Sequence, residues 1–151
     1  QLPITNPQSK IQNPKSKMLR KLEVEIPIKV KTYDIDFAGV VSNIVYIRWL
    51  EDLRVKFLDV YLPLDEQMQR DDIPFLSKTQ IEYKRPVKLF DNVISRMWMS
   101  NLGKVKWTLE AEFISNNQVA ATAIQTGAFV NSENGRPAKL PEELLQKYSQ
   151  C

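Results

Sequence analysis

One segment of the chain predicts a helix that is apolar on almost every side, and this limits the possible folds. Between Asn43 and about Tyr61, apolar residues recur at helical spacing. Further apolar residues extend the apolar face of this helix over most of its circumference: Val45, Tyr46, Trp49, Val55 and Val60. A helix with so little polar surface has to be buried. Ser42 and Asn43 are both good N-cap residues, and Pro63 ends the pattern.

The rest of the chain is mostly typical of β-strands. Residues 22–32 alternate apolar and polar side chains, and Pro27, which lacks an N–H, places this strand at a sheet edge or at a bulge. Further strands are expected at 77–86, 91–99, 104–113 and 119–130, a polar loop or short helix at 65–74, and a closing helix at 142–148. A single apolar helix needs a sheet wrapped around it, which predicts an α+β fold with a long, curved antiparallel sheet. The open sheet edges favour dimerisation.

Missing residue types exclude several kinds of site. The chain has no histidine and one cysteine, Cys151, which excludes histidine-based catalytic triads and makes a zinc site implausible, so we expect no metal and no cofactor. Its four glycines are too far apart for a P-loop or a dinucleotide-binding motif. No apolar run is long enough to span a membrane. The lone cysteine and the lack of a secretory signal favour the cytoplasm.

The positive net charge of +3 lies entirely in the first seventeen residues. Residues 1–17 are rich in Gln, Asn, Pro, Ser and Lys, and they predict a disordered N-terminal extension. Residues 18–151 form a single domain in which acidic and basic residues balance. A nucleic-acid-binding domain would carry its excess positive charge on the folded part, so we expect no nucleic-acid partner.

The turn between the first strand and the helix carries the best candidate for chemistry. Asp36 stands a few residues before a helix N-terminus, whose first N–H groups have no partner within the helix and can face a developing oxyanion. A carboxylate and an oxyanion pocket are enough to cleave a thioester, because a thiolate leaves without a general acid. Asp36 can act as a nucleophile or as a general base, whereas Asp34 is expected to be a solvated charge at the strand end.

The same segment carries a family signature. Its matching positions, in order, are Asp36, Gly39, Val40, Val41, Ser42, Asn43, Tyr46 and Glu51. Further on, Tyr83-Lys84-Arg85-Pro86 and then Asp91 continue the pattern. The chain resembles the 4-hydroxybenzoyl-CoA thioesterase and acyl-CoA thioesterase branch of the hotdog-fold superfamily over roughly residues 22–148.

This resemblance implies a hotdog fold that forms homodimers or homotetramers, with active sites at subunit interfaces. It implies that Asp36 is the catalytic carboxylate and that Asn43 lies beside it. It also implies that backbone N–H groups at Gly39, Ser42 and Asn43 polarise the substrate carbonyl. Many relatives have histidine where Val40 or Asn43 stands here, so the role of that imidazole is absent or passes to Asn43.

Other residues have two possible roles. Val41 and Tyr46 are candidates to line the substrate site, although Tyr46 is more typical of a core residue. Lys84 and Arg85 can bind the phosphates of coenzyme A, or they can be ordinary solvated charges. Glu51 is expected to be a charge on the helix surface or a salt-bridge partner.

The sequence therefore predicts a thioesterase. Its substrate would be an acyl-CoA or an acyl carrier protein thioester, with a mainly apolar tunnel along the helix for the acyl group. The alternative is a non-catalytic hotdog module that binds acyl thioesters or serves as an assembly subunit. A hydratase acting on enoyl-CoA is a weaker third option, because the enzymes of that kind usually use histidine.

Overall fold

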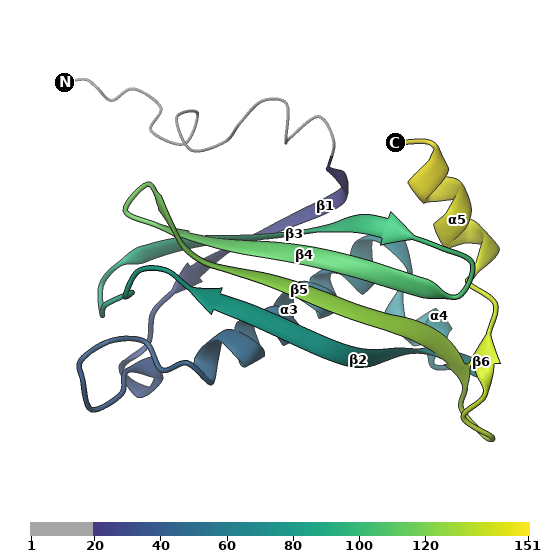
Figure 1. Ribbon diagram of the computed structural model, residues 1–151, viewed down its shortest axis with the longest axis horizontal. Helices are drawn as coiled ribbons and strands as arrows, with labels where there is room; N and C mark the ends of the chain where they lie inside the picture. Colours follow the sequence, from purple (N-terminus) through teal and green to yellow (C-terminus); the bar gives the residue numbers. More distant parts are fainter. Residues whose placement is uncertain (1–19) are drawn as a thin grey trace.

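The structure, a computed structural model, describes residues 20–151, which form an antiparallel sheet with a long helix on one face (Figure 1). The strand order is β1-β3-β4-β5-β2, and a short sixth strand, β6, pairs with β5. The strands are β1 (Lys21–Lys29), β2 (Asp72–Tyr83), β3 (Asn92–Leu102), β4 (Lys106–Ser115), β5 (Gln118–Asn131) and β6 (Pro137–Ala138). The helical elements are η1 (Thr32–Asp34), α3 (Val45–Tyr61), α4 (Leu64–Gln67) and α5 (Glu142–Ser149). The extension expected at residues 1–17 lies outside the described residues.

The core lies between α3 and the sheet. Leu50 and Leu53 of α3 are completely buried, and the sheet contributes Met97 from β3 and Phe113 from β4, which are also fully buried. In each element these side chains lie on one face, because side chains repeat about every 3.6 residues along a helix and every 2 residues along a strand. The predicted architecture, a long antiparallel sheet with one apolar helix, is confirmed.

The prediction that α3 is buried almost all round is wrong for the single chain. Ile47, Val55 and Val60 expose 49%, 37% and 47% of their surface. The sheet covers only one side of the helix, so apolar residues on the other side remain in contact with solvent. The helix also begins later than expected, at Val45.

Both edge strands of the sheet contain a proline. Pro27 lies in β1 at one edge, where its missing N–H removes no hydrogen bond to a further strand, and a register shift follows Lys21 in the same strand. Pro74 lies in β2 at the other edge. β2 begins at Asp72, earlier than predicted, so the polar segment 65–74 divides between α4, a short turn and the first residues of β2.

Candidate functional site

The loop that precedes α3 is held in shape by its own hydrogen bonds. The Asp36 amide donates to the Val40 carbonyl at 2.8 Å, and the Gly39 amide donates to the Asp36 carbonyl at 3.0 Å. Gly39 has a φ of +80°, a conformation that side chains disfavour, so glycine suits this position. Ile35 and Val41 form an isolated β-bridge that closes the loop.

The Asp36 carboxylate takes part in this loop. Its Oδ1 accepts hydrogen bonds from the amides of Ala38 at 2.8 Å and Val40 at 3.4 Å. No other residue in the described range 20–151 donates to the carboxylate, so Oδ2 has no protein partner there. The side chain is half-buried. Two amides therefore orient one carboxylate oxygen and leave the other available.

The residues between this loop and α3 differ in how their amides are used. The Val41 amide donates to Val87 O at 2.7 Å, and the Ser42 amide donates to Asp34 O at 2.9 Å. Within the described residues no acceptor lies in hydrogen-bond range of the Asn43 and Ile44 amides. These two N–H groups lie at the start of a seventeen-residue helix, where the helix dipole favours negative charge.

The expected N-cap role of Ser42 and Asn43 is wrong. The N-cap of α3 is Ile44, and no side chain caps the helix. The Ser42 carbonyl instead accepts from the Val45 amide at 3.0 Å, and the Asn43 carbonyl accepts from the Tyr83 hydroxyl at 2.9 Å. Backbone contacts and β2 thus hold the start of the helix.

Aromatic rings form one wall next to this helix start. Tyr46 is only 3% exposed, and its ring packs edge-to-face on Tyr83, Trp49 and Phe113 at centroid distances of 5.2, 5.0 and 5.3 Å. Burial raises the pKa of Tyr46 to about 12, with a smaller contribution from Tyr83, so the phenol stays neutral at physiological pH. Val41 is also buried. Both positions predicted to line the substrate therefore belong to the core at this end of the molecule.

Asp34 differs from the expectation that it is a solvated charge. It is 6% exposed, and its Oδ2 accepts a hydrogen bond from the Lys31 amide at 2.8 Å. Because Asp34 O also holds the Ser42 amide, this residue connects η1 to the start of α3. The spacing of three residues from Lys31 to Asp34 was the available sequence signal, since an aspartate there can close a short turn.

A second loop, residues 84–91, lies at the same end of the sheet (Figure 1). The amides of Lys84 and Arg85 both donate to Ala120 O, at 2.8 and 3.0 Å, and both side chains are exposed. The Lys84 ammonium lies 3.7 Å from Glu82, a distance typical of a weak surface pair. The hydrogen bond from Val41 to Val87 ties this basic loop directly to the Asp36 loop.

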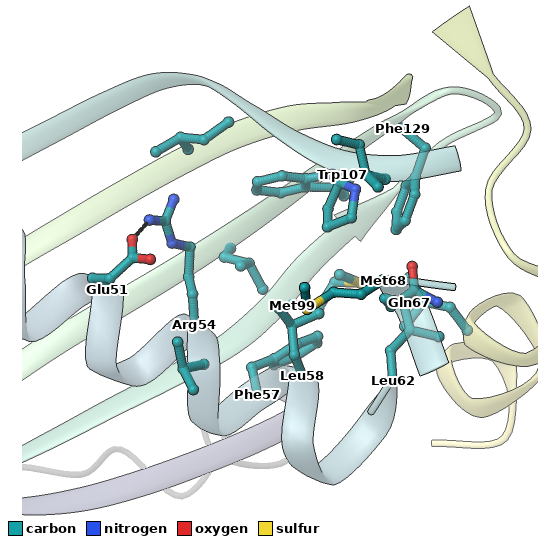
Figure 2. Close-up of a pocket in the computed structure, with 16 residues that line it drawn as sticks. Glu51, Arg54, Phe57, Leu58, Leu62, Gln67, Met68, Met99, Trp107 and Phe129 are labelled. Atoms are coloured by element: carbon teal, nitrogen blue, oxygen red, sulfur yellow. Dashed lines mark hydrogen bonds and ion pairs between the residues drawn. The ribbon is translucent and has the colours of Figure 1, made fainter. Parts of the chain in front are cut away.

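A cavity of about 410 Å³ runs along the second half of α3 (Figure 2). It lies between α3 and the strands β2, β4 and β5, and its lining is mostly apolar. Glu51 and Arg54, which form an ion pair, stand at one end, and Gln67 of α4 stands at the other. Burial lowers the pKa of Arg54. The tunnel expected along the helix is thus present, and Glu51 is a salt-bridge partner as predicted.

Comparison with known proteins identifies the family. The family model described as the thioesterase-like superfamily matches residues 30–148, which is most of the chain. The chain belongs to the thioesterase-like superfamily. The predictions of thioester hydrolysis and of a thioesterase enzyme are thereby confirmed.

Solved thioesterases have the same fold. A thioesterase from Thermus thermophilus, solved with coenzyme A and Zn, is 26% identical with a TM-score of 0.73, over 84% of this chain and 92% of that one. A DHNA-CoA thioesterase from Staphylococcus aureus is 16% identical with a TM-score of 0.74, over 85% and 89%. A 1,4-dihydroxy-2-naphthoyl-CoA thioesterase from Synechocystis is 17% identical with a TM-score of 0.76, over 84% and 96%. The predicted hotdog fold is confirmed.

Two further features of this thioesterase bear on its chemistry. Across residues 20–151, no cluster of three or more Cys, Asp or Glu side chains is arranged to bind a metal ion. The helices in that same part of the chain are all too short or too polar for a transmembrane segment.

Proposed function

We propose that this thioesterase hydrolyses acyl-CoA, with Asp36 as its catalytic carboxylate. The observation that carries the proposal is the half-buried Asp36 side chain, which has one oxygen fixed by two amides of the loop that precedes α3. The similar Thermus thermophilus structure contains coenzyme A, which supports this carrier. An acyl carrier protein thioester is the other candidate substrate.

In the proposed reaction, the thioester carbonyl oxygen faces the open amides of Asn43 and Ile44. Their N–H groups and the dipole of α3 stabilise the negative charge that develops on this oxygen. Gly39 and Ser42 contribute the backbone that shapes the pocket, because their own amides already donate to Asp36 O and Asp34 O. This arrangement polarises the carbonyl without a histidine.

The Asp36 carboxylate then acts in one of two ways. As a general base it takes a proton from a water molecule, whose oxygen adds to the carbonyl carbon before the C–S bond breaks. As a nucleophile it attacks the carbonyl itself, which releases the thiolate and forms an anhydride that water later hydrolyses. In both cases the thiolate leaves directly, since its parent thiol has a pKa of about 8.5.

The rest of the substrate is assigned to the two neighbouring features. The exposed side chains of Lys84 and Arg85, on the loop joined to Val41, bind the phosphates of coenzyme A. The apolar cavity along α3 takes the acyl group. Val41 and Tyr46 are buried and do not line it, so they support the start of α3 from the core. The single cysteine of the chain fits a reducing cytoplasm, which stays our prediction for its location.

We further propose that the enzyme is a homodimer or a homotetramer. β2 is an edge strand of twelve residues, and it offers unpaired backbone groups to a second copy. Apolar side chains remain exposed close to this edge and on the outer side of α3, among them Phe75 at 53%, Ile44 at 66% and Ile47 at 49%. Pairing of two β2 strands would cover such groups in a symmetric interface.

The test is thiol release from a panel of acyl-CoAs by the parent and Asp36→Asn. The asparagine keeps an oxygen that can accept from the Ala38 amide, so the loop is retained while the basic carboxylate is lost. We expect kcat to fall roughly 100-fold or more, the usual contribution of a positioned acid or base. Asp59→Asn, on the exposed side of α3, is the matched control and should keep full activity.

The possible results separate the hypotheses. Equal thiol release by the parent and Asp36→Asn would exclude Asp36 as the catalyst. Binding without release from any thioester would instead favour a non-catalytic module. A single turnover in ¹⁸O-labelled water tests the nucleophilic role: label in the Asp36 carboxylate would establish it, because a general base places the label only in the product acid.

A further inference from the structure

Gln67 is buried without a partner at the end of the cavity. Its side chain is 1% exposed, and it lines the same cavity as Leu62 and Phe129. Neither Oε1 nor Nε2 has a hydrogen-bond partner, and among the buried side chains of residues 20–151 only this one has two unpaired amide atoms. Figure 2 shows the amide at the end of the cavity opposite the ion pair of Glu51 and Arg54.

An unpaired buried amide needs an explanation, because nearly all buried polar groups in proteins are hydrogen-bonded. A structural water is a poor partner here, since it needs two to four polar groups and the surrounding lining is mostly apolar. The only charged groups lining the cavity, Glu51 and Arg54, lie at its opposite end and bind each other. The missing partner is therefore expected to arrive with the ligand.

The chemistry of the amide restricts what this partner can be. Gln67 offers N–H donors at Nε2 and an acceptor at Oε1. A hydroxyl group satisfies both, because it accepts from Nε2 and donates to Oε1. A methyl group satisfies neither, and a carboxylate accepts only and would bring an uncompensated charge into an apolar site.

The length of the cavity restricts the rest of the ligand. From Glu51 to Leu62 the helix advances eleven residues, or about 16 Å at 1.5 Å per residue. This is about half of the roughly 30 Å hydrocarbon core of a bilayer, which two acyl chains fill end to end. The thioester carbonyl is placed at Ile44, eighteen residues or about 27 Å before Leu62, and the exposed side chains of Ile44 and Ile47 continue the path from there to the cavity. An acyl chain of about 22 carbons, fully extended along α3, thus brings its far end to Gln67.

We propose that Gln67 selects acyl chains that carry a hydroxyl group at or near the end remote from the thioester. This inference rests on the proposed hydrolysis of acyl thioesters, and it names the substrate class. The hydroxyl supplies the two hydrogen bonds that the amide lacks. The apolar cavity wall packs on the methylene groups that lie between the thioester and this hydroxyl.

The test compares three coenzyme A thioesters of one chain length. These are docosanoyl-CoA, 22-hydroxydocosanoyl-CoA and its isomer 3-hydroxydocosanoyl-CoA, whose hydroxyl lies close to the thioester. For the parent we expect kcat/KM to be roughly tenfold higher for the 22-hydroxy substrate than for either of the others, as the pairing of a buried polar group allows. Repeating the set with chains two carbons shorter and longer locates the reach of Gln67.

Two variants show whether the amide causes the preference. Gln67→Met keeps the side-chain length and removes both polar atoms, so we expect the preference to disappear or to reverse towards docosanoyl-CoA. Gln69→Met is the matched control, since Gln69 is exposed and does not line the cavity. It should retain the preference of the parent.

The outcomes also separate this inference from the proposed function. If no acyl-CoA is hydrolysed, calorimetric binding of 12-hydroxydodecanoic and dodecanoic acids still tests Gln67, and we expect the hydroxy acid to bind roughly tenfold tighter to the parent only. The inference is overturned if the parent shows no preference for the compound with the terminal hydroxyl, over both comparison thioesters in the kinetic assay or over the unsubstituted acid in calorimetry. It is also overturned if Gln67→Met keeps that preference unchanged.

Discussion

Gly127 of β5 is a position where a single methyl group should destabilise the fold. A Cβ atom placed there would lie 2.1 Å from the backbone oxygen of Phe75 and 2.3 and 2.7 Å from two ring carbons of Trp107. Ordinary contacts between carbon atoms are about 3.5–4.0 Å. Gly127 is paired with Trp107 of β4 and with Leu76 of β2, so both obstacles belong to strands hydrogen-bonded to its own.

The expected cost of Gly127→Ala follows from these contacts. Relief of the contact with Phe75 requires movement of the β2 backbone against β5, and relief of the other two requires Trp107 to shift towards the cavity that it lines. Overpacking of this kind costs about 1–3 kcal/mol, and two rigid obstacles place the cost near the upper limit. Alanine also restricts the unfolded chain more than glycine does, and this offsets the destabilisation by about 0.4–1 kcal/mol. We expect the free energy of unfolding to fall by about 2 kcal/mol and Tm by roughly 8 °C.

The assay is urea unfolding and thermal melting at a fixed protein concentration, with Gly103→Ala as the control. At Gly103 the nearest atom to an added Cβ is the Lys106 oxygen at 3.6 Å, an ordinary contact, so this variant should match the parent within about 0.5 kcal/mol. A Tm for Gly127→Ala within about 1 °C of the parent would refute the close approach of β2, β4 and β5, given the expected shift of several degrees. Equal losses in both variants would assign the effect to alanine in general and not to the clash.

Two further predictions concern buried polar groups. Burial raises the pKa of Tyr46 from 10.0 to about 12 in the folded state, so the neutral phenol stabilises the fold below pH 10. This contribution of about 3 kcal/mol is lost as the pH rises from 10 through 12. Urea titrations should therefore show a smaller alkaline loss of stability for Tyr46→Phe than for the parent, and parallel curves would contradict the burial. Glu112 binds Arg20 at 3.0 Å through each oxygen, and Glu112→Gln should lower the free energy of unfolding by about 2 kcal/mol. Glu82→Gln, in the exposed pair with Lys84, should change it by less than about 0.5 kcal/mol, and equal effects of the two substitutions would show that burial is unimportant.

The features that the sequence predicted correctly are those that depend on local pattern. Helical spacing located α3 and its buried positions such as Leu50 and Leu53, and strict alternation located β1 and β4. Pro27 predicted an edge strand because a missing N–H is tolerated there. The ordered signature from Asp36 to Glu51, together with the segment that begins at Tyr83, was enough to recognise the thioesterase family.

The features that could not be predicted depend on distant contacts. The start of α3 is held by Asp34 and Tyr83, and preferences for N-cap residues carry no information on either contact. The exposed side of α3, with Ile47 and Val60, follows from how far the sheet extends. Gln67 lies in a polar segment, and its burial results from the packing of α4 beneath the sheet, which no local pattern reports.

The last helix of the fold, α5, forms part of the cavity wall, whereas the Asp36 loop does not line the cavity. Leu144 of α5 is one of its lining residues, and the ammonium of Lys147 donates to the carbonyl of Tyr61, the final residue of α3. In the proposed binding mode, α5 therefore sets how deep an acyl chain can enter, although α5 lies more than a hundred residues after the Asp36 loop in the sequence. Substitutions confined to α5 can therefore make the cavity deeper or shallower. The preferred acyl-chain length can then change among related proteins while the Asp36 loop stays the same.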